Sequence, residues 1–91
     1  MIKSFRHRGL KRLYERDDAS GINANYLRRV KRIIFALDVA TEAQQLDVPG
    51  FQFHALRGDM KDFYSIRVSG NWRIVFRFDD EPEDVDLVDY H

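Results

Sequence analysis

Apolar residues in the first half of the chain recur at helical spacing. Leu10, Leu13 and Tyr14 predict an amphipathic helix from His7 to about Arg16. A longer apolar stripe predicts a second helix, and its members are Leu27, Val30, Ile33, Ile34 and Leu37. Asn23 is expected to cap that helix. The segment Thr41 to Gln44 matches a capping box, so a short helical turn is expected before Pro49-Gly50.

After Gly50 the pattern changes to strict alternation, which predicts strands near 51–56, 64–69, 72–78 and 85–90. Met1–Phe5 is a further candidate strand. Ser69-Gly70-Asn71 predicts a tight hairpin, and the acidic stretch Asp79 to Asp84 predicts a second turn. Such short connections require antiparallel pairing. We therefore expect one α+β domain over residues 1–91, with two N-terminal helices on one face of a three- to five-stranded antiparallel sheet.

Composition narrows the class of protein. The 91 residues include no cysteine, which excludes disulfides, thiol nucleophiles and zinc–thiolate sites. No apolar run approaches the roughly 18 residues of a membrane span, so we expect a cytoplasmic protein without membrane contact.

The net charge of zero hides a polarity along the chain. The first 34 residues contain ten of the fifteen Lys and Arg residues, so this part is strongly basic and the remainder is acidic. A chain of this kind can present a basic face to a polyanion. Basic residues that merely solvate the outer helix faces explain the same pattern.

Alternation also sorts the strand residues between the two faces of the sheet. The helix-covered face is predicted to contain Phe53, Ile66, Val68, Ile74, Phe76 and Phe78. The open face then contains His54, Arg67, Arg73 and Arg77, together with Tyr90 if the last strand keeps its parity. Histidine, tyrosine and several arginines on one surface suit a polyanionic ligand.

These side chains permit only a few kinds of chemistry. No spacing supports a metal site, a nucleophilic serine or a glycine-rich phosphate loop, so no cofactor is expected. Metal-free RNA cleavage needs a base for the 2′-hydroxyl, an acid for the leaving oxygen and cations for the charged phosphorane. Histidine, tyrosine and arginine can fill those roles. On chemistry alone, surface residues without a catalytic function are the more common explanation of such a pattern.

Several short motifs follow one another in an order and spacing typical of one family. They are Ile2-Lys3-Ser4-Phe5, Gly9-Leu10, Leu37-Asp38, Ala40-Thr41, Pro49-Gly50, His54-Ala55-Leu56, Gly58, Ser65-Ile66-Arg67-Val68, Gly70-Asn71-Trp72-Arg73-Ile74, Phe76 and Val88-Asp89-Tyr90-His91. On these motifs, essentially the whole sequence resembles the HigB branch of the RelE/ParE toxin superfamily. The closing Val88-Asp89-Tyr90-His91 is the most specific of them.

The resemblance implies a ribosome-dependent messenger-RNA endoribonuclease that uses no metal. The family's catalytic positions fall on His54, Asp89, Tyr90 and His91, joined by Arg73. Its phosphate-binding positions also fall on Arg57 and Arg67. Positive charge for docking to the ribosome would come from Arg6, Lys11, Arg12, Arg28, Arg29 and Arg32. Family members are usually clearly basic, and this chain departs from that pattern.

The resemblance also implies a protein partner. A HigA-type antitoxin with a helix-turn-helix domain would bind the toxin, and the pair would bind operator DNA through the antitoxin. Two alternatives stay open at this point. One is a non-enzymatic inhibitor of DNA gyrase, as in the ParE branch, and the other is a catalytically weak relative that only binds a partner. The set of His54 with Asp89-Tyr90-His91 favours the ribonuclease.

Overall fold

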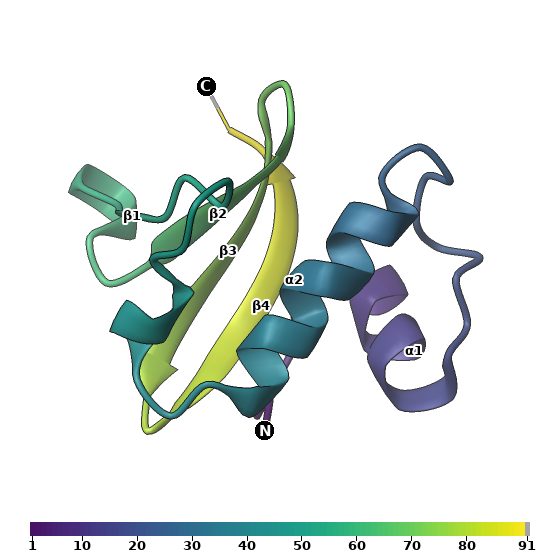
Figure 1. Ribbon diagram of the computed structural model, residues 1–91, viewed down its shortest axis with the longest axis horizontal. Helices are drawn as coiled ribbons and strands as arrows, with labels where there is room; N and C mark the ends of the chain where they lie inside the picture. Colours follow the sequence, from purple (N-terminus) through teal and green to yellow (C-terminus); the bar gives the residue numbers. More distant parts are fainter. Residues whose placement is uncertain (91) are drawn as a thin grey trace.

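The computed structural model describes residues 1–90 and shows two helices beside a twisted sheet (Figure 1). Helix α1 is Arg8–Arg16 and helix α2 is Leu27–Val39. The strands are β1 (His54–Ala55), β2 (Tyr64–Ser69), β3 (Trp72–Asp79) and β4 (Glu81–Asp89). Single turns of 3-10 helix occur at Ala43–Leu46 and Gly58–Met60. None of the helices in the described part of the chain is both long and apolar enough to cross a membrane.

The four strands pair in the order β1-β2-β3-β4, and every pair is antiparallel. The hairpin between β2 and β3 turns at Gly70, whose φ of 56° lies in the left-handed region that glycine adopts without steric cost. The predicted α+β fold with an antiparallel meander is therefore confirmed, with four strands in the sheet.

The core lies between the helices and one face of the sheet. The predicted stripe of α2 is buried at Val30, Ile33, Ile34 and Leu37, and Leu10 and Leu13 of α1 join the same cluster. The sheet contributes Ile66, Val68, Ile74 and Phe76, as its alternation predicts. Each fully buried aliphatic or aromatic side chain stabilises the fold by about 1.5–3 kcal/mol, so this layer accounts for the arrangement of the elements.

Several predicted boundaries are wrong, each for a local reason. Met1–Phe5 forms no strand of its own, although Phe5 makes a parallel bridge to Val85 at the outer side of β4. Helix α2 begins at Leu27 rather than next to Asn23, because the Asn23 side chain accepts a hydrogen bond from Asn25 N–H in a preceding turn. The capping box lies one residue later than predicted, between Glu42 and Gln45.

The acidic stretch 79–84 is mostly strand rather than turn. The chain reverses at Asp80, whose φ is 65°, and β4 already begins at Glu81. Pro82 is buried, and its carbonyl oxygen accepts a hydrogen bond from Lys3 N–H at 2.8 Å. A bulge then places both Asp84 and Val85 opposite Phe76, with Asp84 at a φ of 53°. The prediction failed because pairing with the N-terminal segment outweighs the low strand propensity of these residues.

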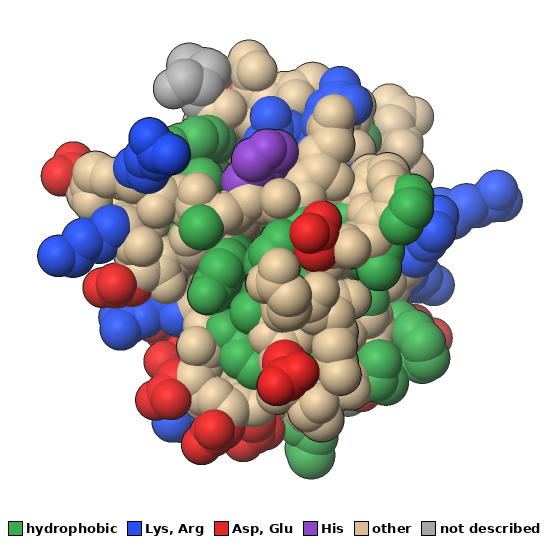
Figure 2. Space-filling view, turned by 60° about the vertical axis from the view of Figure 1, so that its left-hand side comes forward, with side chains coloured by type: hydrophobic (Ala, Val, Ile, Leu, Met, Phe, Trp, Pro, Cys, Tyr) green, Lys and Arg blue, Asp and Glu red, His purple; other side chains and the backbone are tan. Residues whose placement is uncertain are grey.

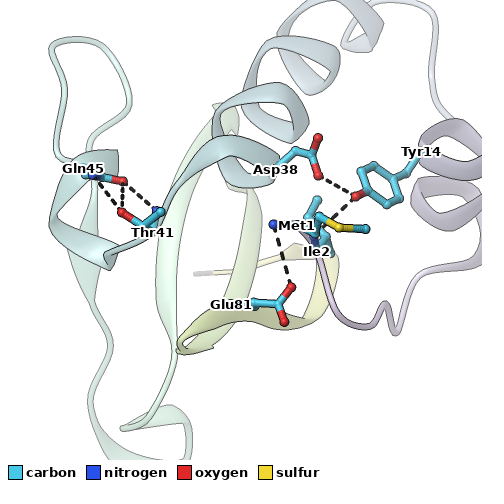
Figure 3. Close-up of polar contacts among 7 residues, drawn as sticks. All are labelled: Met1, Ile2, Tyr14, Asp38, Thr41, Gln45 and Glu81. Carbon is cyan, nitrogen blue, oxygen red and sulfur yellow. Dashed lines mark hydrogen bonds and ion pairs between the residues drawn. The ribbon is translucent and has the colours of Figure 1, made fainter.

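Two partly buried hydrogen bonds of Tyr14 join the two helices and the N-terminal segment (Figure 3). The Tyr14 hydroxyl on α1 donates a short hydrogen bond to the Asp38 carboxylate on α2 and accepts one from Ile2 N–H at 3.4 Å. Burial, reinforced by the bond to Asp38, raises the pKa of Tyr14 above its ordinary value. The hydroxyl therefore stays protonated and remains a donor well above neutral pH.

We expect Tyr14→Phe to lower the free energy of unfolding by about 1–3 kcal/mol, because the Asp38 carboxylate loses its donor. Urea denaturation measures the change, and the exposed Tyr90→Phe is the control, with an effect within about 0.5 kcal/mol. The Tyr14 contribution is complete below about pH 10 and is lost as pH rises through the raised pKa of the folded state. The difference between wild-type protein and Tyr14→Phe should shrink accordingly, and a gap that widens with pH would contradict this account.

Candidate active site

One hollow on the open face of the sheet is lined by residues from five parts of the chain. It has a volume of about 360 Å³ and is lined by His54, Ala55, Leu56, Arg57, Ser65, Arg73 and Tyr90. These residues come from β1, the loop after it, β2, β3 and the position directly after β4. On the face seen in Figure 2, a histidine and basic side chains gather in the upper part, whereas acidic side chains collect towards the lower edge.

His54 is exposed, and its ring is oriented by the backbone. The Nδ1 atom lies 2.8 Å from the carbonyl oxygen of Gln52. Because a carbonyl oxygen can only accept, Nδ1 carries the hydrogen and donates it. In the neutral ring, Nε2 then holds the lone pair. This tautomer leaves Nε2 as the atom that can take up or deliver a proton.

Arg67 and Arg73 occupy directly facing positions on β2 and β3. Both guanidinium groups donate to the carbonyl oxygen of Gly70, Arg67 through Nε at 3.4 Å and Arg73 through Nη1 at 3.2 Å. Two like charges on facing strand positions repel each other, which destabilises the hairpin locally. A bound anion relieves that repulsion, so this pair favours a phosphate-sized ligand at the mouth of the hollow.

The other walls of the hollow come from Arg57, Tyr90 and Ser65. Tyr90 is 37% exposed, and its N–H donates to Asn71 O at 2.9 Å, which keeps the residue beside the β2–β3 hairpin. Ser65 faces His54 across the β1–β2 pair and is only 3% exposed. Sequence reasoning missed Ser65. The only signal in the sequence was a small polar residue at a position of β2 that alternation places on the open face. In the structure, Ser65 forms the floor of the hollow.

Three predicted site residues in the described part of the chain do not line the hollow, namely Arg67, Asp89 and Arg77. Asp89 pairs with Trp72 and has the strand parity opposite to Val88, so it points to the other side of β4. Arg77 lies along β3 with its guanidinium carbon 5.9 Å from the ring of Phe63. His91 falls outside the described residues.

The six cations predicted to dock on a ribosome lie in separate places. Arg6 is 3.9 Å from Asp84 and covers the ring of Phe63. Arg29 and Arg32 lie over the ring of Phe51, at 5.4 and 5.7 Å from its centroid. The remaining three are Lys11, Arg12 and Arg28, of which Arg12 pairs with Asp18 at 3.7 Å. Lys11 and Arg12 share an outer surface of α1 with Arg8 and Arg16.

The acidic residues of the β3–β4 turn lie far from the hollow. Asp79, Asp80 and Glu81 form the β3–β4 turn, at the opposite end of β3 from Arg73. Arg73 and Asp79 are six positions apart along extended strand, a distance of about 20 Å. That distance exceeds the Debye length of about 8 Å at physiological ionic strength, so the turn barely affects the potential at the hollow.

Comparison with known proteins identifies the family of this chain. Residues 3–91 match the family model of the RelE-like toxin of the type II toxin-antitoxin system HigB. The chain is also 44% identical to the Endoribonuclease HigB of Proteus vulgaris over 78 residues, which cover 86% of this chain and 85% of that protein. The chain therefore belongs to the HigB family of RelE-like toxins of type II toxin-antitoxin systems.

Proposed function

We propose that this toxin is a ribosome-dependent endoribonuclease that cleaves messenger RNA at the hollow around His54. The observation that carries the proposal is the convergence of His54, Arg57, Arg73 and Tyr90 in one hollow, drawn from segments that are distant in sequence. These are the groups that metal-free RNA cleavage needs. The name of the Proteus vulgaris relative supports the same reaction.

The reaction begins with a proton transfer from the 2′-hydroxyl of the substrate to Nε2 of neutral His54. The 2′-oxygen then bonds to phosphorus as the bond from phosphorus to the 5′-oxygen breaks, which leaves a cyclic 2′,3′-phosphate and a 5′-hydroxyl. The proton for the 5′-oxygen comes from Tyr90 or His91, which are adjacent in sequence. In this proposal, Asp89 acts from the edge of the site, because it does not line the hollow.

Positive charge stabilises the reaction at its most anionic point. Arg73 is half-buried beside the hollow, where its guanidinium can bind the phosphorane through two hydrogen bonds. Arg57 and Arg67 hold the neighbouring phosphates. The repulsion between Arg67 and Arg73 in the unliganded protein makes phosphate binding there more favourable.

The hollow is shallow, with both His54 and Tyr90 exposed. Few groups are available to hold RNA in the in-line geometry that the reaction requires, so the ribosome supplies that positioning. Of the predicted docking cations, we propose Lys11 and Arg28, since Arg12 pairs with Asp18 at 3.7 Å. Arg29 and Arg32 are engaged with the Phe51 turn, and Arg6 with Phe63 and Asp84.

Membership of a type II system implies a protein antitoxin as partner. We propose a HigA-type antitoxin with a helix-turn-helix domain, which brings the pair to its operator DNA. The toxin itself contacts messenger RNA and ribosomal RNA, and it uses no cofactor.

Two histidine variants test the assignment of the proton-transfer groups. His54→Ala and His91→Ala should each lower the rate of messenger-RNA cleavage on ribosomes by about 10²–10⁴-fold, because general acid and base catalysis is worth that much. Both should fold, since His54 leaves no core cavity. His7→Ala is the matched control. His7 caps α1 by accepting from Leu10 N–H, so that variant should lose stability and keep activity while folded. Wild-type growth arrest by both variants at equal expression would refute the assignment.

Dependence on the ribosome is tested by comparing two substrates. Purified protein should cleave naked messenger RNA poorly and ribosome-bound messenger RNA efficiently, with cuts in frame with codons. Mapping of 5′ ends after brief exposure measures both. Efficient cleavage of naked RNA without codon phasing contradicts the proposal, and gyrase inhibition without cleavage supports a ParE-like function instead.

Docking and chemistry should be separable by mutation. Arg73→Ala should keep ribosome association and lower cleavage by about 10²–10³-fold, because the phosphorane loses its guanidinium. The double variant Lys11→Glu with Arg28→Glu should weaken association and reduce its dependence on salt, since fewer counterions are released on binding. Ribosome co-sedimentation at several salt concentrations measures association. Lys61→Glu, outside both sets, is the control for net charge. If Arg73→Ala by itself abolished ribosome association, the proposed separation between docking residues and catalytic residues would be wrong.

A further inference from the structure

The turn that delivers the chain to His54 has an unfavourable backbone conformation. Gly50 has a φ of 90°, and Gln52, which carries a Cβ, has a φ of 49°. Residues other than glycine seldom adopt this left-handed conformation, so the surrounding structure must hold Gln52 in it. The carbonyl oxygen of Gln52 is also the acceptor for His54 Nδ1. The conformation of the turn therefore sets the orientation of the His54 ring.

Strand β1 alone provides little anchoring for this turn. It contains only His54 and Ala55, which pair with Ser65 and Tyr64 of β2. The stronger attachment lies at Phe51. Phe51 is 2% exposed, and its carbonyl oxygen accepts a hydrogen bond from Arg67 N–H at 2.9 Å. Contacts that hold the backbone around Phe51 in place therefore also hold His54, which lies three positions later.

Arg29 of α2 is the side chain that closes over this turn. Its Nε and Nη2 donate to the carbonyl oxygen of Arg67 at 3.1 and 2.8 Å, and Nη2 also donates to the carbonyl oxygen of Gly50. The guanidinium carbon lies 5.4 Å from the centroid of the Phe51 ring. One planar group thus joins helix α2, strand β2 and the start of the turn.

The setting of Arg29 is costly for a cation. Burial, and then the nearby charges of Arg32 and Arg67, lower the pKa of Arg29 from its ordinary value. The compensation comes from backbone carbonyl oxygens and an aromatic face, and in the described part of the chain no ion pair joins Arg29 to a carboxylate. A cation that serves only solubility would extend into solvent instead, as the exposed Arg28 next to it does.

We propose that Arg29 is a positioning residue, which holds the Gly50–Gln52 turn against β2 so that Gln52 keeps His54 in the Nδ1–H tautomer with Nε2 in the hollow. The inference rests on the proposed function, in which Nε2 takes the substrate proton. Arg29 itself touches no reacting atom. Its effect passes through the carbonyl oxygens of Gly50 and Arg67, then Phe51 and Gln52.

The test compares Arg29→Met and Arg29→Lys with wild-type protein. Methionine keeps an apolar side chain over Phe51 and removes every donor. Lysine keeps one charge but lacks the planar fork that serves two carbonyls at once, so it should rescue the defect in part. Lys31→Met removes a charge from the same helix, where Lys31 makes only a solvent-exposed ion pair of 3.9 Å with Asp17, and is the matched control.

The decisive readout is nitrogen NMR of the His54 ring at a pH where the ring is neutral, with the signals assigned by their loss in His54→Ala. Wild-type protein and Lys31→Met should show mainly the Nδ1–H tautomer. Arg29→Met should show a mixture with the Nε2–H form, and Arg29→Lys should lie between them. Cleavage on ribosomes should fall in the same order, up to about 100-fold for Arg29→Met, with ribosome association unchanged.

Three outcomes would overturn the inference. They are an unchanged tautomer in folded Arg29→Met, a loss of cleavage without a change of tautomer, and a loss of ribosome association that accounts for the loss of cleavage. If Arg29→Met fails to fold, Arg29→Lys decides the question by the same measurements. Normal cleavage by His54→Ala would refute the proposed function. The NMR comparison would still decide whether Arg29 positions the ring.

Discussion

Burial of the apolar stripe of α2 is the constraint on which the rest of this structure depends. Val30, Ile33 and Leu37 are fully buried against the face of the sheet that contains Ile66 and Ile74. Since both helices lie in the same core as that face, the opposite face is left for Arg67 and Arg73, which lie beside the buried Val75. The candidate active site is a consequence of this one-sided covering, because only the open face can accept a chain as large as RNA.

Two short parts of the chain contribute to the candidate active site, and both are held in place by the β2–β3 hairpin. Strand β1 is two residues long, and Tyr90 follows the last residue of β4. Each is fixed by contacts with the β2–β3 hairpin, through Ser65 on one side and Asn71 on the other. The hairpin in turn is part of the core through Ile66, Ile74 and Phe76. Stability is thus concentrated on the inner face, and the outer face keeps a repulsive pair of arginines that a phosphate can neutralise.

The neutral net charge does not conflict with binding to RNA. Acidic residues gather at the β3–β4 turn, where Glu81, Glu83 and Asp84 also pair with Met1, Lys3 and Arg6 of the N-terminal segment. In that position they help to attach the segment that completes the outer side of β4. The hollow, at the other end of the sheet, is lined by arginine and histidine with no carboxylate among its described residues. Local charge, not the total, determines what this face attracts.

By itself the sequence determined the two helices, the Gly70 hairpin, the four strands and the division of side chains between the faces, because period and turn chemistry are local properties. The motifs from Ile2 to His91 also placed the chain in its family. Only the tertiary structure decided that Ser65 forms the floor of the site, that Asp89 lies outside it and that Asp84 forms a bulge. It likewise placed Arg29, predicted as a ribosome-docking cation, in a hydrogen bond to the carbonyl oxygen of Arg67, a residue 38 positions away. The Arg29 contact depends on which backbone carbonyl groups remain without a donor after the elements pack, and no local sequence pattern contains that information.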